Sequence, residues 1–225
     1  MTFSIVARSK DAGMFGVAIT SSSPAVAARC AYARSGVGAV ATQNVTNPSL
    51  GPAALAALQR QASAREAVDT VIASEPHRDF RQLLAIGPVG PPAIRSGSRV
   101  LGEHGEAFGK DSAAAGNLLA RSTVPYAMVQ AFEGGDAPFA HRLLTALQAG
   151  LGEGGEAGAL HSAGLLIVRS DVSWPIVDLR VDWIDRDPIA SLLVAWEVFE
   201  PQVEDYIRRA IDPEAAPSYG VPGDP

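Results

Sequence analysis

Cysteine is nearly absent from this sequence, in which Cys30 is the only one among 225 residues. A single cysteine excludes an intrachain disulfide and is typical of a protein from a reducing compartment. The four histidines match no metal-ligand spacing, so we expect neither a metal site nor any other cofactor. A phosphate-binding loop, HExxH and Gly-x-Ser-x-Gly are also absent. A Ser-His-Asp triad stays open, because its members can be distant in sequence.

Long apolar runs and clusters of positive charge are missing too. No stretch approaches the roughly 18 apolar residues that indicate a membrane-spanning helix. The N-terminal residues lack the basic and apolar segments of a secretory signal. Lys and Arg number 18 against 24 Asp and Glu, a net charge of −6. The sequence therefore predicts a cytoplasmic protein with neither nucleic acid nor membrane as its main partner.

Apolar and turn-forming residues are plentiful. Hydrophobic residues make up 47% of the chain, which also contains 22 glycines and 16 prolines. This composition favours a substantial core with many turns, and no linker-like stretch divides it. We therefore expect one domain over residues 1–211, followed by a Pro/Gly-rich C-terminal arm or tail over residues 212–225.

The first 47 residues have the clearest pattern. Strands are predicted over residues 1–7, 15–20 and 37–42, and a turn at 11–13 makes the first two a hairpin. The first strand alternates: Phe3, Ile5 and Ala7 share one face, while Thr2, Ser4 and Val6 share the other. The glycines of residues 36–41 partly match a dinucleotide-binding fingerprint. They open a strand where that fingerprint opens a helix, so we reject this interpretation.

The rest of the chain alternates between helix pairs and strands. Residues 25–34 are alanine-rich and predict a short helix or an irregular crossing. Helices are predicted from Pro52 to about residue 61, from a Ser63 capping box to about residue 75, over 122–133, after an Asp136 cap, and from Asp187 to a break at Pro201. Strands are predicted over 81–86, 94–101, 106–110, 162–169 and 176–183, and a flexible loop over 150–158. This order predicts an α+β fold of two antiparallel sheets with outer helices.

Thr2 is the candidate nucleophile. Its small side chain permits removal of Met1, which would give Thr2 a free α-amine. Such an amine has a pKa near 7.7–8.0 in model peptides, so it can act as the base for the threonine's own hydroxyl. The alternative is that Thr2 is an ordinary residue at the start of a strand.

Several segments together resemble the uncharacterised family numbered 1028 among domains of unknown function. The resemblance extends to about Leu193. Its most specific parts are residues 1–7 and residues 36–43. The segments are Met1-Thr2-Phe3-Ser4-Ile5-Val6-Ala7, Gly36-Val37-Gly38-Ala39-Val40-Ala41-Thr42-Gln43, Thr46-Asn47-Pro48 with Gly51-Pro52, Arg81-Gln82, Gly116-Asn117 with Leu119, and Val177-Asp178-Leu179-Arg180-Val181-Asp182.

By fold, that family is grouped with the N-terminal nucleophile (Ntn) hydrolases. The resemblance implies a four-layer αββα sandwich and hydrolysis of an amide bond. Two positions differ from the proteasome-like pattern. Residues 21–23 are serines where an acidic residue ends the second strand, and no lysine precedes the third strand, where Arg29 and Arg34 are the nearest basic residues.

The remaining site candidates follow from this resemblance. Gln43 and Asn44 follow the third strand, where such folds place donors for a substrate oxyanion. Ser21 and Ser22 are positioned to contact Thr2 across the hairpin. Arg81, Gln82 and Asn117 are further candidates for substrate binding, and a guanidinium can bind a carboxylate in bidentate fashion. For each, the alternative is a structural role in a turn, cap or strand end.

Arg180 and His104 are two further residues for which the sequence indicates a role. Arg180 lies between Asp178 and Asp182 on one strand face, which favours a structural ion pair. His104 is the one histidine whose loop, between two glycines, resembles a site.

Two functions are consistent with this sequence. The first is an amidohydrolase that uses Thr2 on a small amide or peptide-like compound. The second is a non-catalytic protein of the same fold that binds a ligand or assembles into a homodimer or higher homo-oligomer, with the final helix and the tail around a partner subunit.

Overall fold

A computed structural model describes residues 2–11 and 13–222. Met1 and Ala12, which belong to the predicted first strand and turn, and 223–225, the end of the predicted tail, lie outside the described residues. A six-stranded antiparallel sheet has the order β10-β9-β2-β1-β8-β7. Its strands are β1 (Thr2–Arg8), β2 (Met14–Ser21), β7 (Gly105–Phe108), β8 (Ser112–Asn117), β9 (Ser162–Arg169) and β10 (Pro175–Val181).

The second sheet has four strands in the order β3-β4-β5-β6. They are β3 (Ala31–Arg34), β4 (Gly38–Asn44), β5 (Arg81–Ile86) and β6 (Ala93–Ser96). The helices are α1 (Val26–Cys30), α2 (Leu50–Gln59), α3 (Ala64–Ala73), α4 (Val124–Gly134), α5 (Phe139–Gly152), α6 (Pro188–Phe199) and α7 (Val203–Ile211), with short 3₁₀ turns at Arg78–Phe80 and Glu200–Gln202.

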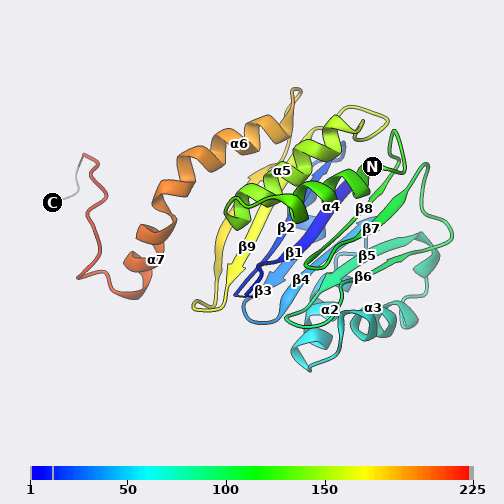
Figure 1. Cartoon of the computed structure of the whole chain (residues 1–225), viewed down its shortest axis with the longest axis horizontal. Coiled ribbons are helices and arrows are strands. Elements are labelled where there is room, and N and C mark those ends of the chain that lie inside the picture. The colour runs from blue at the N-terminus through cyan, green and yellow to red at the C-terminus, as the bar shows by residue number, and fades with distance from the viewer. Residues whose placement is uncertain (1, 12, 223–225) are drawn as a thin grey trace.

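Three buried apolar layers show how these elements stack. One lies between the six-stranded sheet and α4, α5 and α6, and a second lies between the two sheets. The third lies between the four-stranded sheet and α2 and α3. Figure 1 shows these helices on the outer faces of the sheets. The predicted four-layer αββα arrangement is confirmed.

The alternation predicted for the first strand is confirmed in β1. Phe3 and Ile5 pack beneath the helices, and Val6 packs between the sheets. Successive side chains of a strand point to opposite faces. Thr2 and Ser4 therefore face the layer between the two sheets.

Several local predictions are also confirmed. β5 has the predicted bounds, and both hydrogen bonds of the Ser63 capping box are present. The Asp187 carboxylate caps α6 by accepting from the backbone N–H groups of Ile189 and Ala190. The chain bends into a 3₁₀ turn at Pro201 before α7 begins. No helix in the described part of the chain is long and apolar enough to cross a bilayer.

Other predictions were wrong in ways that affect the site. The short helix predicted as one alternative for residues 25–34 is present as α1, but the strand β3 that follows it was not predicted. β8 was missed entirely, because its central alanines have low intrinsic strand preference; packing between β1 and β7 determines its structure. Asp136 does not cap α5, which begins after Pro138 without a side-chain cap. The predicted loop at 150–158 includes the end of α5 and one buried carboxyl group, that of Glu156.

In Figure 1, α7 lies at one edge of the layered body, where its Val203 and Ile207 join the buried layer beneath the helices of the six-stranded sheet. Residues 213–222 contain no helix or strand.

Candidate functional site

The layer between the sheets is apolar over most of its length and polar at one end. Strand register places Thr2 beside Asn117 of β8, and Phe3 beside Thr20 of β2, so Ser21 ends next to Thr2. From the opposing sheet, Gln43 and Gln82 face the same layer. Their strand neighbours two residues away, Ala41 and Leu84, belong to the apolar cluster between the sheets.

The side chains at this polar end form a buried hydrogen-bond network. Thr2 Oγ1 lies 3.2 Å from Ser21 Oγ, and Thr2 is only 5% exposed. Ser4 Oγ donates to Gln43 Oε1 at 2.7 Å. Gln43 Nε2 donates to Gln82 Oε1 at 2.7 Å and to the Ala115 carbonyl oxygen at 3.1 Å. The bonds of Ser4, Gln43 and Gln82 thereby tie the two sheets together, and the Thr2–Ser21 contact lies beside them on the neighbouring strand ends.

Gln43 has no donor left for a substrate, because these two bonds use both of its amide hydrogens. Its position suits it to hold the network in place. Gln82 Nε2 is likewise committed to Ser96 Oγ and the Gly116 carbonyl oxygen.

Asn117 differs from both glutamines. Its Nδ2 donates to Gln82 Oε1 at 3.2 Å, and its side chain is fully buried. Its Oδ1 has no hydrogen-bond donor among the described residues. An unpaired buried amide oxygen is unfavourable unless a partner arrives. Asn117 therefore has hydrogen-bonding capacity to offer beside Thr2.

Asn44 and Arg81 do not join this group. They pair with each other across β4 and β5, one residue out of phase with Gln43 and Gln82, so they point to the helix-covered face. Asn44 Nδ2 donates to the Phe80 carbonyl oxygen at 2.6 Å. Arg81 forms an ion pair with Glu75 at 3.1 Å. The geometry gives both side chains structural contacts away from Thr2.

Arg180 and His104 also have their contacts away from Thr2. Arg180 pairs with Asp178 on its own strand, through bonds of 2.7 and 2.8 Å, in agreement with the predicted structural role. His104 is exposed, and its Nδ1 lies 3.2 Å from the Gly102 carbonyl oxygen.

Glu156 is a residue that the sequence pattern did not single out. The loop after α5 is held at one end by Ala157 N–H to the Leu118 carbonyl oxygen, at 3.0 Å, and at the other by His161 N–H to the Ser21 carbonyl oxygen, at 2.9 Å. Since β1 lies between β8 and β2, residues 157–161 cross the end of the sheet where Thr2 lies. Positive φ angles at Gly154 and Gly155 lead the chain into this crossing.

The Glu156 side chain is 6% exposed, and its carboxylate accepts from the Ser22 backbone N–H at 3.2 and 3.3 Å. Burial raises the pKa of Glu156 to about 7, although the charge of the N-terminal amino group and then the hydrogen bonds from Ser22 oppose this shift. Ser22 thus contributes through both its side chain and its backbone. No sequence signal distinguishes Glu156 from Glu153 in the same segment.

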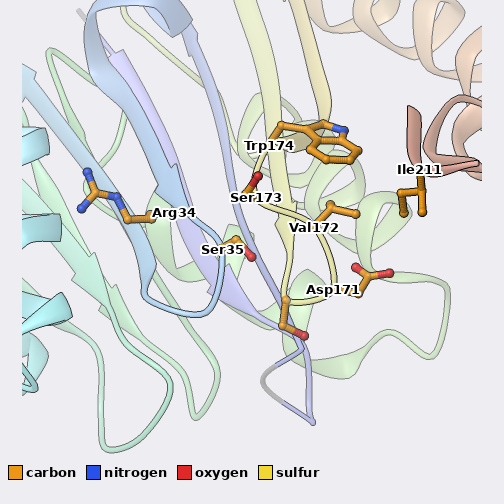
Figure 2. Close-up of a pocket in the computed structure, with 8 residues that line it drawn as sticks. Arg34, Ser35, Asp171, Val172, Ser173, Trp174 and Ile211 are labelled. Atoms are coloured by element: carbon orange, nitrogen blue, oxygen red, sulfur yellow. The ribbon is translucent and has the colours of Figure 1, made fainter. Parts of the chain in front are cut away.

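Two cavities lie near opposite ends of β9. One of about 420 Å³ is lined by Glu156, His161 and residues 185–188, and Thr2 is not among its lining residues. A larger one of about 750 Å³ lies where β9 ends, at the opposite end of the sheet (Figure 2). Trp174 and Ile211 flank that cavity, while Arg34 turns away to bond Gln59. It contains no predicted site residue, so size alone does not locate the site.

The described residues contain no group of three or more His, Cys, Asp or Glu side chains that could hold a metal ion.

Together, the fold and network define an α+β sandwich with a threonine hydroxyl at the start of a central strand. Residues 2–192 match the model of a family described as "Family of unknown function (DUF1028)", and the chain belongs to this family. A crystal structure of a DUF1028 protein from Silicibacter pomeroyi is similar, with a TM-score of 0.84 and 29% identity, over 92% of this chain and 94% of that chain.

Anbu (ancestral beta-subunit) from Yersinia bercovieri is a more distant match. Its TM-score is 0.39 and its identity 14%, over 92% of this chain and 97% of that chain, values too low to carry an argument. No curated protein matches the chain.

We predict that Glu156→Gln makes stability less dependent on pH. A carboxyl group whose pKa is raised by folding keeps its proton where the unfolded chain has lost it, so stability falls as pH rises from about 4.5 to about 7. Glutamine can still accept from Ser22 N–H and does not ionise. Urea unfolding at pH 5 and pH 8 should show the wild type losing about 2–3 kcal/mol more than the variant. Equal losses would contradict the assigned burial cost.

Proposed function

We propose that this protein is an N-terminal-nucleophile amidohydrolase that cleaves a small amide or peptide-like substrate with Thr2, once the peptide bond before Thr2 has been cut. The observation that carries this proposal is the position of the Thr2 hydroxyl, 3.2 Å from Ser21 Oγ at the polar end of the layer between the sheets. Family membership and the αββα sandwich are consistent with it. The single buried cysteine and the charge balance support a cytoplasmic location.

The chemistry follows from a free amine beside its own hydroxyl. The α-amine accepts the hydroxyl proton as Thr2 Oγ1 attacks the substrate carbonyl carbon. The tetrahedral intermediate then expels the amine product, which leaves with that proton, and an ester to Thr2 remains. Water, activated by the same α-amine, hydrolyses the ester and restores the hydroxyl. No cofactor is needed for these steps.

The neighbouring residues have distinct roles in this proposal. Ser21 orients Oγ1 through its 3.2 Å contact. Gln43 and Gln82 position the network, because their amide hydrogens are already donated within it. Asn117 has one Nδ2 hydrogen beyond its bond to Gln82, which suits it to stabilise negative charge on the substrate oxygen.

Labelling with a β-lactone probe, which acylates nucleophilic hydroxyl groups, tests the role of Thr2 without a known substrate. Protein that begins at Thr2 should gain one probe equivalent by intact mass, at Thr2 by peptide mapping. Thr2→Ser should retain labelling, and in Thr2→Ala labelling should fall at least about a hundredfold, since that variant lacks the hydroxyl that the amine activates. The same loss is expected when a residue still precedes Thr2. Undiminished labelling of Thr2→Ala, with native circular dichroism, would refute the proposal.

We also propose that the protein is a homo-oligomer that assembles through α6. This helix buries Leu192 and Trp196 against the body, yet Val194 is 61% exposed and Val198 is 65% exposed one turn further along. Apolar residues on both sides of a surface helix are typical of a helix covered by a partner. A second copy of this chain supplies an identical apolar stripe, as a twofold contact requires.

Light scattering after size exclusion tests this assembly. The wild type should be a dimer or larger, and Val194→Asp with Val198→Asp should be a monomer, because two carboxylates would be buried in the interface. Ala53→Asp, which adds a charge on the exposed face of α2, should leave the assembly intact. A monomeric wild type, or an unchanged mass in the double variant, would rule out this interface.

A further inference from the structure

The cavity of about 420 Å³ is lined in part by the loop that crosses the Thr2 end of the sheet. Leu151 at the end of α5 and Pro188 at the start of α6 form parts of its wall, and Glu156 and His161 come from the loop itself. The Glu156 carboxylate bonds Ser22 N–H, next to the serine that contacts Thr2. Glu156 therefore links this cavity to the Thr2 network.

Glu156 has acceptor capacity that the described residues do not use. The Ser22 backbone N–H and side chain approach the carboxylate, and the N-terminal amino group acts on it electrostatically, whereas an ionised carboxylate has about four lone-pair sites. Burial still raises the pKa of Glu156 to about 7, so a further donor or positive charge would stabilise the ionised form. The cavity is the open side from which a ligand can supply them.

The other polar groups of the cavity are mostly acceptors as well. His161 Nδ1 lies 2.9 Å from the Ile184 carbonyl oxygen and 3.6 Å from Asp185 Oδ1, so this nitrogen is a donor. Asp185 and Asp187 also line the cavity, although Asp187 is engaged in capping α6. Arg186 is the one Lys or Arg among the lining residues. This balance favours a ligand that carries donors and positive charge.

We propose that this cavity binds the protonated amine of a small substrate, with its ammonium group against Glu156. Leu151, Leu160 and Pro188 supply apolar wall for a short carbon chain. The volume of about 420 Å³ is within the usual range for small-molecule sites. That the bound amine belongs to a substrate of Thr2 rests on the proposed function; the binding itself does not.

Binding should strengthen with pH. The charged and titratable side chains that line the cavity are Glu156, His161, Asp185, Arg186 and Asp187, and the charge of the N-terminal amino group also acts on Glu156. An alkylammonium group stays protonated to a pKa of about 10.4, whereas Glu156 ionises near pH 7, so the attraction grows between pH 6 and pH 8. His161 also lines the cavity. Any pH dependence of binding that remains in the Glu156→Gln variant comes from groups other than Glu156.

The test compares n-butylammonium with 1-butanol, a neutral ligand of similar shape, by amide NMR shifts in the Thr2→Ala protein. We expect butylammonium to shift the amides of Ser22 and Glu156 and to bind at least about tenfold more tightly than butanol at pH 8. Glu156→Gln should remove that preference and its pH dependence. Asp69→Asn, which removes one negative charge from α3, should change neither the preference for butylammonium nor the pH dependence of that preference.

Equal affinity for the two ligands, or a preference that Glu156→Gln leaves intact, would overturn the proposal. The comparison in the Glu156-containing protein needs no Glu156 variant, so it stands even where Glu156→Gln fails to fold. Because Thr2→Ala lacks the nucleophile, failure of amine binding is distinct from failure of Thr2 labelling, and either result can occur without the other.

Discussion

β1 is packed on both faces, and this constraint determines where every functional group of the site lies. Phe3 and Ile5 are buried under α4 and α5, which fixes the phase of the strand, since a shift by one residue would bury polar side chains beneath the helices. The same phase directs Thr2 and Ser4 into the layer between the sheets. The burial of two apolar side chains therefore orients the candidate nucleophile.

The layer between the sheets changes character along its length. Where Val6, Val17 and Ile86 meet, it is an apolar core; at the Thr2 end it contains hydroxyl and amide groups that satisfy one another across the two sheets. Such a network is costly if any member lacks a partner, and it is rigid when they are paired. Among the described residues, Asn117 Oδ1 beside Thr2 has no donor, and Arg81 Nε, which lies away from Thr2, has no acceptor.

The sequence allowed the architecture to be predicted because its strongest signals are local. The alternation in β1, the Ser63 capping box and the Asp187 cap each depend on residues a few positions apart. β8 could not be found this way, because three consecutive alanines become a central strand only when neighbouring strands bury them. Only part of the site could be predicted, because the rest depends on contacts between residues far apart in the sequence. Gln43 and Asn44 are adjacent in sequence, yet only the register with β5 shows which faces Thr2. Glu156 reaches the site through long-range loop contacts that no local pattern records.

The catalytic role of Thr2 requires a free α-amine on that residue. Peptide mapping of the N-terminus in protein purified from its native cells tests directly whether the amine is free. We expect the mature chain to begin at Thr2 with an unblocked amine, so that the base lies beside the hydroxyl. Protein in which every molecule retains a residue before Thr2, or carries a blocked Thr2 amine, would contradict the catalytic role while leaving the fold unchanged.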